Sequence, residues 1–205
     1  MNINNLYKVE RKDVERCVTT LKDAFRDDPL WREVFRDDPN KDQALTGFYT
    51  MPILYGLKFG KVFAPSAGIE GVAVWLPGEK SFMGFLGLLR CGALSCGAKF
   101  GKSTMNNLSR LGKHLVPDRK RHMKDKKYTY LLIIGVKSEH QGKGYGGALL
   151  KKIVAECDES NRYLYLETES EGTAMFYEKH GFNTVQKINV DRINVPMWEM
   201  ARPPQ

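Results

Sequence analysis

A run of glycines between a strand pattern and a helix pattern limits the folds open to this chain. The stretch HQGKGYGGALL (140–150) holds four glycines within six positions, 142–147. The preceding KYTYLLIIGV (127–136) is apolar nearly throughout, as a central strand buried on both faces is. Apolar residues then recur at helical spacing, at Ala148, Leu149, Leu150, Ile153, Val154 and Cys157. Backbone this bare at a helix N-terminus indicates that a ligand approaches it closely.

The remaining patterns predict strands and helices on both sides of this unit. We expect an early strand over LYKVE (6–10), helices over 12–25 and 43–59, and a short helix that opens at Asp28-Pro29. KVFAPSA and GVAVWLP read as a hairpin over 61–77. After the glycines we expect strands over YLYLETE (163–169), FNTVQKINV (182–190) and VPMWEMA (195–201), and a helix in TAMFYEKHGF (173–182) that stops at Gly181.

Residues 77–127 differ from their surroundings. They are rich in Gly, Ser and Lys, and their apolar residues recur at helical spacing without any strand pattern. A connection of this length is uncommon unless it is functional. We therefore predict a helical insertion between the third and fourth strands. It is a candidate lid over the substrate, and the alternative is a packed helical pair without a catalytic duty.

Composition narrows the class of protein. The 205 residues fit a single domain spanning 1–205, and the net charge of +8 favours anionic partners without choosing among them. The four cysteines have no metal-ligand spacing, so we expect no metal site and no disulfide framework, but free thiols in a reducing cytoplasm. The most apolar window, 82–100, is interrupted by Arg90 and by glycines, which argues against a membrane span.

The glycines fit two different phosphate-binding signatures. Gly142, Gly144 and Gly147 spell the dinucleotide fingerprint G-x-G-x-x-G, with Glu167 at 20 residues beyond for a ribose hydroxyl. Against it, five residues separate Val136 from the first glycine, and the 58 residues after Gly147 are too few for the rest of a doubly wound sheet. The same glycines also fit Q-x-x-G-x-G, an acyl-CoA loop that begins at Gln141.

The second signature carries a resemblance to a known family. VKSEHQGKGYGGALL resembles the acetyl-CoA loop of the GNAT superfamily of N-acetyltransferases, and FYEKHGF (176–182) resembles its late helix, which carries a tyrosine. The likeness is continuous over about 128–182. AVWLPG (73–78) and VPMWEMARPP (195–204) are more weakly similar to the branch that contains puromycin N-acetyltransferase. The resemblance implies an α+β, three-layer fold with a mixed, mostly antiparallel sheet flanked by helices.

The resemblance also implies where acetyl-CoA binds. The pyrophosphate would sit on backbone amides of the loop, and the amide-rich arm would lie along the strand that precedes it. Gly135 within that strand indicates a bulge or a close backbone approach. Thr173 stands where related sequences often carry Asn, so it would make fewer hydrogen bonds to the arm, or it is simply a helix N-terminal residue. The cofactor-binding residues expected are Ile134, Gly135, Val136, Gln141, Gly142, Lys143, Gly144, Tyr145, Gly146, Gly147, Thr173 and Phe176.

For catalysis the resemblance implies that Tyr177 protonates the departing thiolate, which a phenol with a pKa near 10 can do at neutral pH. The general base is less defined: Glu167 ranks first, with Glu169 on the same strand face, Glu70, His140 or a chain of waters as alternatives. We predict an acetyl-CoA-dependent N-acetyltransferase acting on a primary amine of a small molecule.

Two alternatives stay open at the level of sequence. One is a protein or peptide N-acetyltransferase with the same chemistry. The other is a non-catalytic acyl-CoA- or nucleic-acid-binding regulatory protein, for which the basic run PDRKRHMKDKK (117–127) is the only support. That run is more typical of a solvated connector, so we expect neither a nucleic-acid nor a membrane partner. A monomer or a homodimer is expected.

Overall fold

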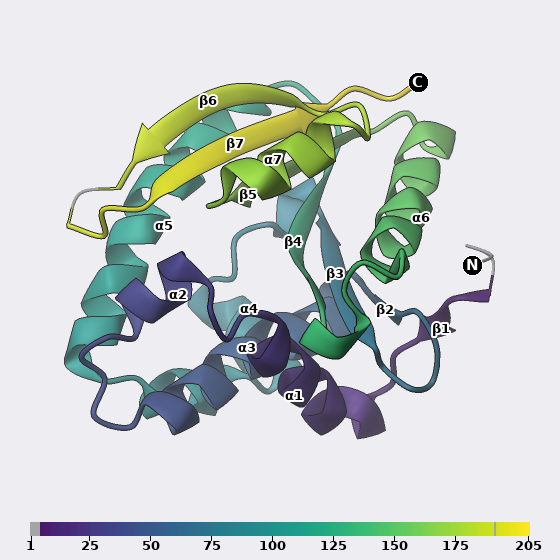
Figure 1. The fold of residues 1–205 in the computed structure, drawn as a ribbon. Coiled ribbons are helices and arrows are strands. Elements are labelled where there is room, and N and C mark those ends of the chain that lie inside the picture. Colours follow the sequence, from purple (N-terminus) through teal and green to yellow (C-terminus); the bar gives the residue numbers. More distant parts are fainter. Residues whose placement is uncertain (1–4, 191) are drawn as a thin grey trace.

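The computed structural model describes residues 5–190 and 192–205, which form a seven-stranded sheet with helices on both faces (Figure 1). The strand order is β1-β2-β3-β4-β5-β7-β6, in which β4 and β5 are parallel and the other neighbours antiparallel. The strands are β1 (Tyr7–Lys8), β2 (Lys61–Ala64), β3 (Gly71–Pro77), β4 (Tyr128–Val136), β5 (Tyr163–Thr168), β6 (Asn183–Asn189) and β7 (Pro196–Arg202). The expected mixed, mostly antiparallel sheet is confirmed.

The helices follow the predicted periodicity closely. They are α1 (Val14–Ala24), α2 (Pro29–Val34), α3 (Lys41–Phe59), α4 (Phe85–Cys91), α5 (Lys102–His122), α6 (Tyr145–Glu159) and α7 (Glu171–Glu178). Asp28 caps α2 by accepting a hydrogen bond from the backbone N–H of Trp31, with Pro29 in the first turn, as predicted. In the described part of the chain, no helix is long and apolar enough to cross a membrane.

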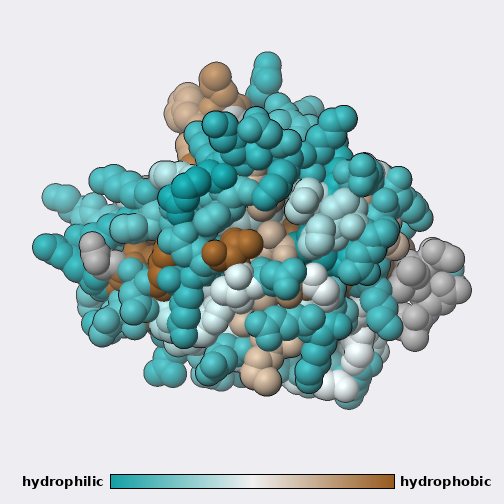
Figure 2. Space-filling view, turned by 90° about the horizontal axis from the view of Figure 1, so that it is seen from above, coloured by the Kyte–Doolittle hydropathy of each residue, from teal (hydrophilic) through white to brown (hydrophobic). Residues whose placement is uncertain are grey.

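Burial on both faces explains why the central strands are apolar throughout. Along β3, Val72 and Val74 pack into one cluster with α1 and α3, while Ala73 and Trp75 pack into another with α6 and α7. Each large apolar side chain removed from water contributes about 1.5–3 kcal/mol. Successive side chains of β3 point to opposite faces of the sheet, so their burial stabilises a helical layer on each side. The outer surface is mostly hydrophilic on the face seen in Figure 2, with apolar groups only in small separate areas.

The parallel strands β4 and β5 pair only at one end. Their register covers Tyr128–Tyr130 against Tyr163–Tyr165, whereas β4 runs on to Val136 paired with β3 alone. Beyond Tyr130 the two strands separate, and β5 continues along β7. The sheet is thus split between β4 and β5, and backbone groups on the open side of β4 have no strand partner there.

A β-bulge accompanies this split, but it does not lie at Gly135. The register between β3 and β4 passes from Trp75–Leu131 to Val74–Ile133, so Leu132 is the extra residue. Gly135 instead marks a close approach of α1. A Cβ there would stand 2.9 Å from a ring carbon of Phe25 and 3.0 Å from the Cβ of Ala24. The bulge therefore lies three residues before Gly135, and the close contacts at Gly135 come from side chains rather than from a neighbouring backbone.

The predicted helical insertion between the third and fourth strands is confirmed, with α4 and α5 lying between β3 and β4. Its basic end is not a simple solvated connector. The last turns of α5 lie against the sheet, where Arg119 is buried and its guanidinium stacks on the Tyr130 ring at 3.9 Å. The four cysteines are all free and buried, as expected.

Candidate active site

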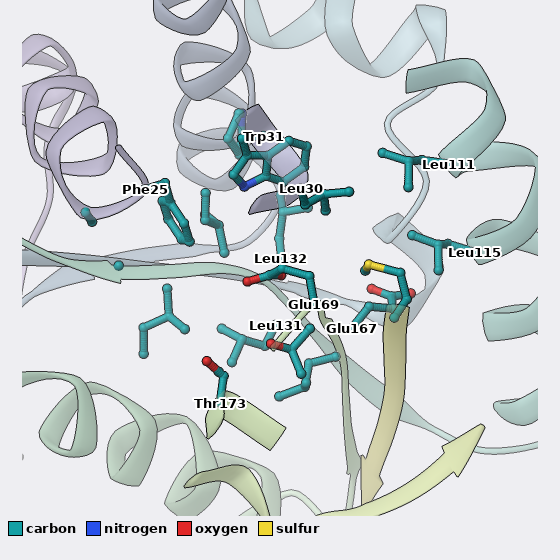
Figure 3. Close-up of a pocket in the computed structure, with 18 of the residues that line it drawn as sticks. Phe25, Leu30, Trp31, Leu111, Leu115, Leu131, Leu132, Glu167, Glu169 and Thr173 are labelled. Atoms are coloured by element: carbon teal, nitrogen blue, oxygen red, sulfur yellow. The ribbon is translucent and has the colours of Figure 1, made fainter. Parts of the chain in front are cut away.

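A cavity of about 400 Å³ occupies the split between β4 and β5 (Figure 3). Its floor is formed by β4, the end of β5 and α7, and its walls come from α1, α2, α3 and α5. Most of the walls are apolar. They include Phe25, Leu30, Trp31, Phe48, Met51, Met83, Leu108, Leu111, Leu115, Leu132 and Met197. The insertion therefore covers one side of the cavity through α5. Among the described residues, the carboxyl groups of the lining, Glu167 and Glu169, lie at the end of β5 and just after it.

The glycine loop lies between β4 and α6 and takes up a backbone that few residues adopt. Gly142 has φ +73° and Gly144 has φ +84°, the left-handed region that strains residues with a Cβ. Gly144 is the residue before the first turn of α6, whose leading N–H groups have no partner within the helix. The glycines are thus required by the shape of the turn.

Three of the loop glycines have no neighbouring atoms that would exclude a larger side chain, so close packing does not explain why these positions are glycine. A Cβ added at Gly142, Gly144 or Gly147 would meet no other atom within 4 Å. The space above the loop is therefore free for a ligand, and the positive end of the 15-residue helix α6 favours an anion there. The backbone suits a pyrophosphate, and the exposed Lys143 adds positive charge beside it.

Hydrogen bonds hold the approach to this loop in place. Both the backbone N–H and the hydroxyl of Ser138 donate to Asp23 at the end of α1, at 2.7 and 2.6 Å. The Gln141 side-chain amide donates to the Val136 carbonyl at 3.1 Å. The end of β4 and the start of the loop are thereby tied together. Gln141, the residue that the sequence signature requires, is also part of the cavity lining.

Helix α7 brings Thr173 and Tyr177 to the cavity. It begins at Glu171, two residues earlier than expected, because the Ser170 hydroxyl caps it by accepting from the Thr173 N–H. Thr173 and Tyr177 are four residues apart, so they share a helix face, and both line the cavity. Thr173 is therefore both a helix N-terminal residue and a cavity residue. Phe176 lies outside the lining and packs against His180, with ring centroids 4.5 Å apart.

Tyr177 is buried between this cavity and the core. Its ring packs against that of Phe182, and its side chain is 5% exposed. Burial, with a smaller effect of the nearby Glu169, raises the pKa of Tyr177 above its usual value. The phenol therefore keeps its proton across the physiological range and is able to donate it.

Glu167 also lines the cavity, but its carboxylate is already engaged. It accepts a hydrogen bond from the Tyr130 hydroxyl at 2.7 Å and forms a buried salt bridge with Arg119 at 3.4 Å. Burial raises the pKa of Glu167 and the Arg119 charge opposes that rise. The contacts tie α5 to β5. They leave Glu167 a less accessible proton acceptor than its place in the cavity alone indicates.

The neighbouring Glu169 has a different environment. It follows directly after β5 and lines the cavity. Burial and the negative charge of Asp28 raise the pKa of Glu169 to about 8. Figure 3 shows Glu169 at the centre of the view, with Glu167 beside it and Thr173 to the lower left. Among the described residues, neither Asp28 nor Glu169 has a salt bridge to a basic side chain.

The structure thus brings most of the predicted residues to one place. Ile134, Gly135, Val136, Gln141, Glu167, Thr173 and Tyr177 all line the cavity, and Gly142 to Gly147 form the adjoining turn and first helical residues. Phe176 is the exception. The sequence did not indicate the role of Arg119, which lies in a run typical of a solvated connector. No local pattern reveals its contact with Glu167, because the two residues are far apart in the chain.

Comparisons with known proteins agree with this geometry. Residues 116–184 match the family model of the acetyltransferase (GNAT) domain. Over 206 aligned residues the chain is 27% identical to an uncharacterized N-acetyltransferase of Schizosaccharomyces pombe, covering 97% of this chain and 83% of the relative.

Solved structures share the fold across nearly the whole chain. A protein of Corynebacterium glutamicum described as histone acetyltransferase HPA2 and related acetyltransferase aligns with a TM-score of 0.64 and 21% identity, over 98% of this chain and 96% of that one. Arylalkylamine N-acetyltransferase 2 of Aedes aegypti aligns with a TM-score of 0.64 and 17% identity, over 98% and 99%.

The split sheet, the glycine turn at a helix N-terminus and the buried tyrosine beside the split are the features that the resemblance to acetyltransferases implies. Residues 116–184, which hold the glycine turn, β5 and α7, match the GNAT domain model, and the chain is similar to N-acetyltransferases over nearly its whole length. The expected family is confirmed. The relatives include enzymes named for proteins and enzymes named for small amines, so the family does not fix the acceptor.

Proposed function

We propose that this protein transfers the acetyl group of acetyl-CoA to a primary amine of a small molecule. The observation that carries the proposal is the cavity of about 400 Å³ that joins the open edge of β4 to Tyr177 and is covered by the insertion. A cavity of this size, with mostly apolar walls and a few polar groups, suits a small ligand better than an extended peptide. It favours the small amine over a protein acceptor, and residues 77–127 act as a cover over the substrate.

In this proposal the pyrophosphate of acetyl-CoA binds at the amides of Gly142 to Gly147, with Lys143 and Tyr145 beside it. The amide-rich arm lies along Ile134–Val136, where the split leaves backbone groups of β4 without a β5 partner. Thr173 contacts the arm from α7, whereas Phe176 supports α7 from outside the cavity. A backbone N–H near Val136 stabilises the oxyanion that forms when the amine attacks the thioester.

Tyr177 is the proposed proton donor to the departing sulfur. Its buried phenol stays protonated and faces the same cavity as the free edge of β4. Glu167 remains a predicted base, although its bonds to Tyr130 and Arg119 favour a role in positioning α5. Acetyl-CoA is a cosubstrate here, and the proposal requires no metal. A cytoplasmic location and a monomer or homodimer stay predictions.

Titration calorimetry and a thiol-release assay test the proposal on the unmodified protein and on Tyr177→Phe. Acetyl-CoA should bind both proteins with similar affinity. The variant should lose about 100-fold or more in kcat, since general acid catalysis contributes about that much. No binding of acetyl-CoA at high micromolar concentration would overturn the proposal. An unchanged kcat in the variant would overturn only the role of Tyr177.

A further inference from the structure

The insertion between β3 and β4 carries a surface that is both apolar and basic. Eight large apolar side chains are exposed among the described residues, and five of them lie close together in the sequence, at Phe82, Phe85, Leu86, Leu89 and Leu94. Phe85 is 66% exposed and Leu86 71%. Soluble proteins rarely leave such a cluster uncovered, and where they do it marks a site of contact with a protein or a membrane.

Helix α4 exposes these residues because its other side is the one that packs. Cys91 is buried, and a Cβ at Gly87 would stand 2.7 Å from the ring of Tyr55 on α3. These positions face α3, beside which α4 lies (Figure 1). Residues three and four apart share one side of a helix, so the apolar residues at the remaining positions form a single outward surface. We call this surface the α4 patch, which consists of Phe82, Phe85, Leu86 and Leu89.

The positive charge of the chain lies in the insertion as well. Residues 77–127 hold twelve Lys or Arg against three Asp or Glu, a net charge of +9, so the rest of the chain is close to neutral. Lys80 precedes the α4 patch and Arg90 follows it within α4, and both are exposed. Glu79, beside Lys80, is the acidic residue at this end. The patch is thus framed by cations along the chain.

The far end of the insertion returns to the same place. Met123, just after α5, packs into one core cluster with Cys91 of α4. The Tyr128 hydroxyl lies 2.9 Å from that of Ser81, the residue before Phe82. The segment between these two contacts therefore lies near the α4 patch. It adds three exposed cations and one exposed acid, which are Lys124, Lys126, Lys127 and Asp125.

We propose that the α4 patch docks on the surface of a membrane that contains anionic lipid. Phe and Leu side chains enter the boundary between headgroups and acyl chains, while Lys and Arg stay at the charged headgroups. An exposed apolar cluster framed by cations suits that surface. A second copy of the chain suits it less, because a symmetric contact would bring two positively charged surfaces together. Nucleic acid would engage the cations but not aliphatic side chains such as Leu86 and Leu89.

This proposal departs from the expectation of no membrane partner. That expectation rested on the basic run 117–127 alone, which the structure places beside the apolar residues of α4.

The α4 patch is separate from the active-site cavity. None of its four residues lines the cavity, although Met83, between Phe82 and α4, does. Substitutions in the patch therefore leave the proposed acetylation machinery in place. Membrane binding is measured without acetyl-CoA and does not depend on the proposed function.

Co-sedimentation with lipid vesicles tests the proposal. The unmodified protein should bind vesicles of phosphatidylcholine with about one third phosphatidylserine, and should bind pure phosphatidylcholine about tenfold or more weakly. Phe85→Gln combined with Leu86→Gln should weaken binding to the anionic vesicles by about tenfold or more, because two apolar side chains no longer enter the bilayer. The matched control combines Met175→Gln with Val185→Gln, two exposed apolar residues outside the insertion.

A second pair of variants tests the cations. Arg90→Gln combined with Lys124→Gln should weaken binding by about fivefold for each charge removed, and added salt should weaken binding of the unmodified protein as well. Lys8→Gln combined with Lys179→Gln removes the same net charge at exposed positions outside the insertion. This control should change binding by less than about twofold, because its charges lie away from the proposed docking surface.

Several outcomes would overturn the inference. Absence of binding to the anionic vesicles is one, and equal binding by the α4 patch variant and its control is another. A loss in the charge variant without a loss in the patch variant would indicate adsorption by charge alone, which also contradicts the proposal. Light scattering after gel filtration tests the other occupant. A dimer of the unmodified protein that becomes a monomer in the patch variant would assign the α4 patch to a second copy of the chain.

Discussion

At the scale of single residues, two glycines with left-handed backbone conformations set the shape of the loop before α6. Gly142 and Gly144 turn the chain so that the first amides of α6 face open space. Their role was predictable from sequence, because a glycine-rich turn between a strand and a helix needs this backbone. Their positive φ values show that the requirement is conformational, in addition to the access that a bare backbone gives.

Replacement of Gly144 by Ala should weaken acetyl-CoA binding by about tenfold or more. A residue with a Cβ in the left-handed region costs about 1–2 kcal/mol, and relief of that strain would move the amides away from the phosphate site. Gly112→Ala is the matched control, since Gly112 lies within α5 with open space around it. Calorimetric titration of both variants with acetyl-CoA measures the difference. Equal affinities would show that the turn is not part of the binding site.

At the scale of elements, the basic end of α5 is the largest departure from the sequence expectation. A run of six Lys or Arg reads as a solvated face, yet Arg119 is buried against Tyr130 and paired with Glu167. One residue of such a run turns inward without any change of local pattern. Its carboxylate partner lies on β5, 48 residues further along the chain, so sequence spacing carries no sign of the contact.

The Arg119–Glu167 pair should couple the insertion to the sheet. Arg119→Met leaves a buried carboxylate without its partner and should cost about 3–5 kcal/mol in the free energy of unfolding. The double variant with Glu167→Gln should recover part of that loss. Urea denaturation of the two single variants and the double variant gives the coupling energy. Strictly additive effects would mean that the two side chains do not interact.

At the scale of the whole molecule, the order of elements was largely predictable and the contacts between distant elements were not. The spacing of apolar residues predicted each strand from β1 to β7 and the helical insertion, because burial on one or both faces of an element determines which nearby positions are apolar. A bulge or a close approach was expected at Gly135, whereas the bulge lies at Leu132, because only the pairing partners of a strand show where its register shifts.

Global stability should respond to pH through Glu199 on β7. This carboxyl is fully buried, accepts a hydrogen bond from the Tyr165 hydroxyl at 3.1 Å and contacts His122 at 3.0 Å. Burial, with Asp118 nearby, raises its pKa from 4.5 to about 7. Between these two values the folded state binds more protons than the unfolded state, so this group's contribution to stability falls as pH rises.

Glu199→Gln removes that titration. Relative to the variant, the unmodified protein should therefore lose unfolding free energy between pH 5 and pH 8, as measured by chemical denaturation at each pH. The comparison with the variant cancels the contribution of the other titrating groups. Parallel curves for the two proteins over this range would show that Glu199 titrates normally.

Identification of the reaction product tests most directly whether the protein acetylates small amines. The protein would be incubated with acetyl-CoA and either hexylamine or a panel of short peptides, with free thiol and product mass followed together. We expect thiol release that depends on hexylamine and matches, mole for mole, the appearance of its N-acetyl derivative. Acetylation of peptides with no reaction of hexylamine or other small amines would contradict it.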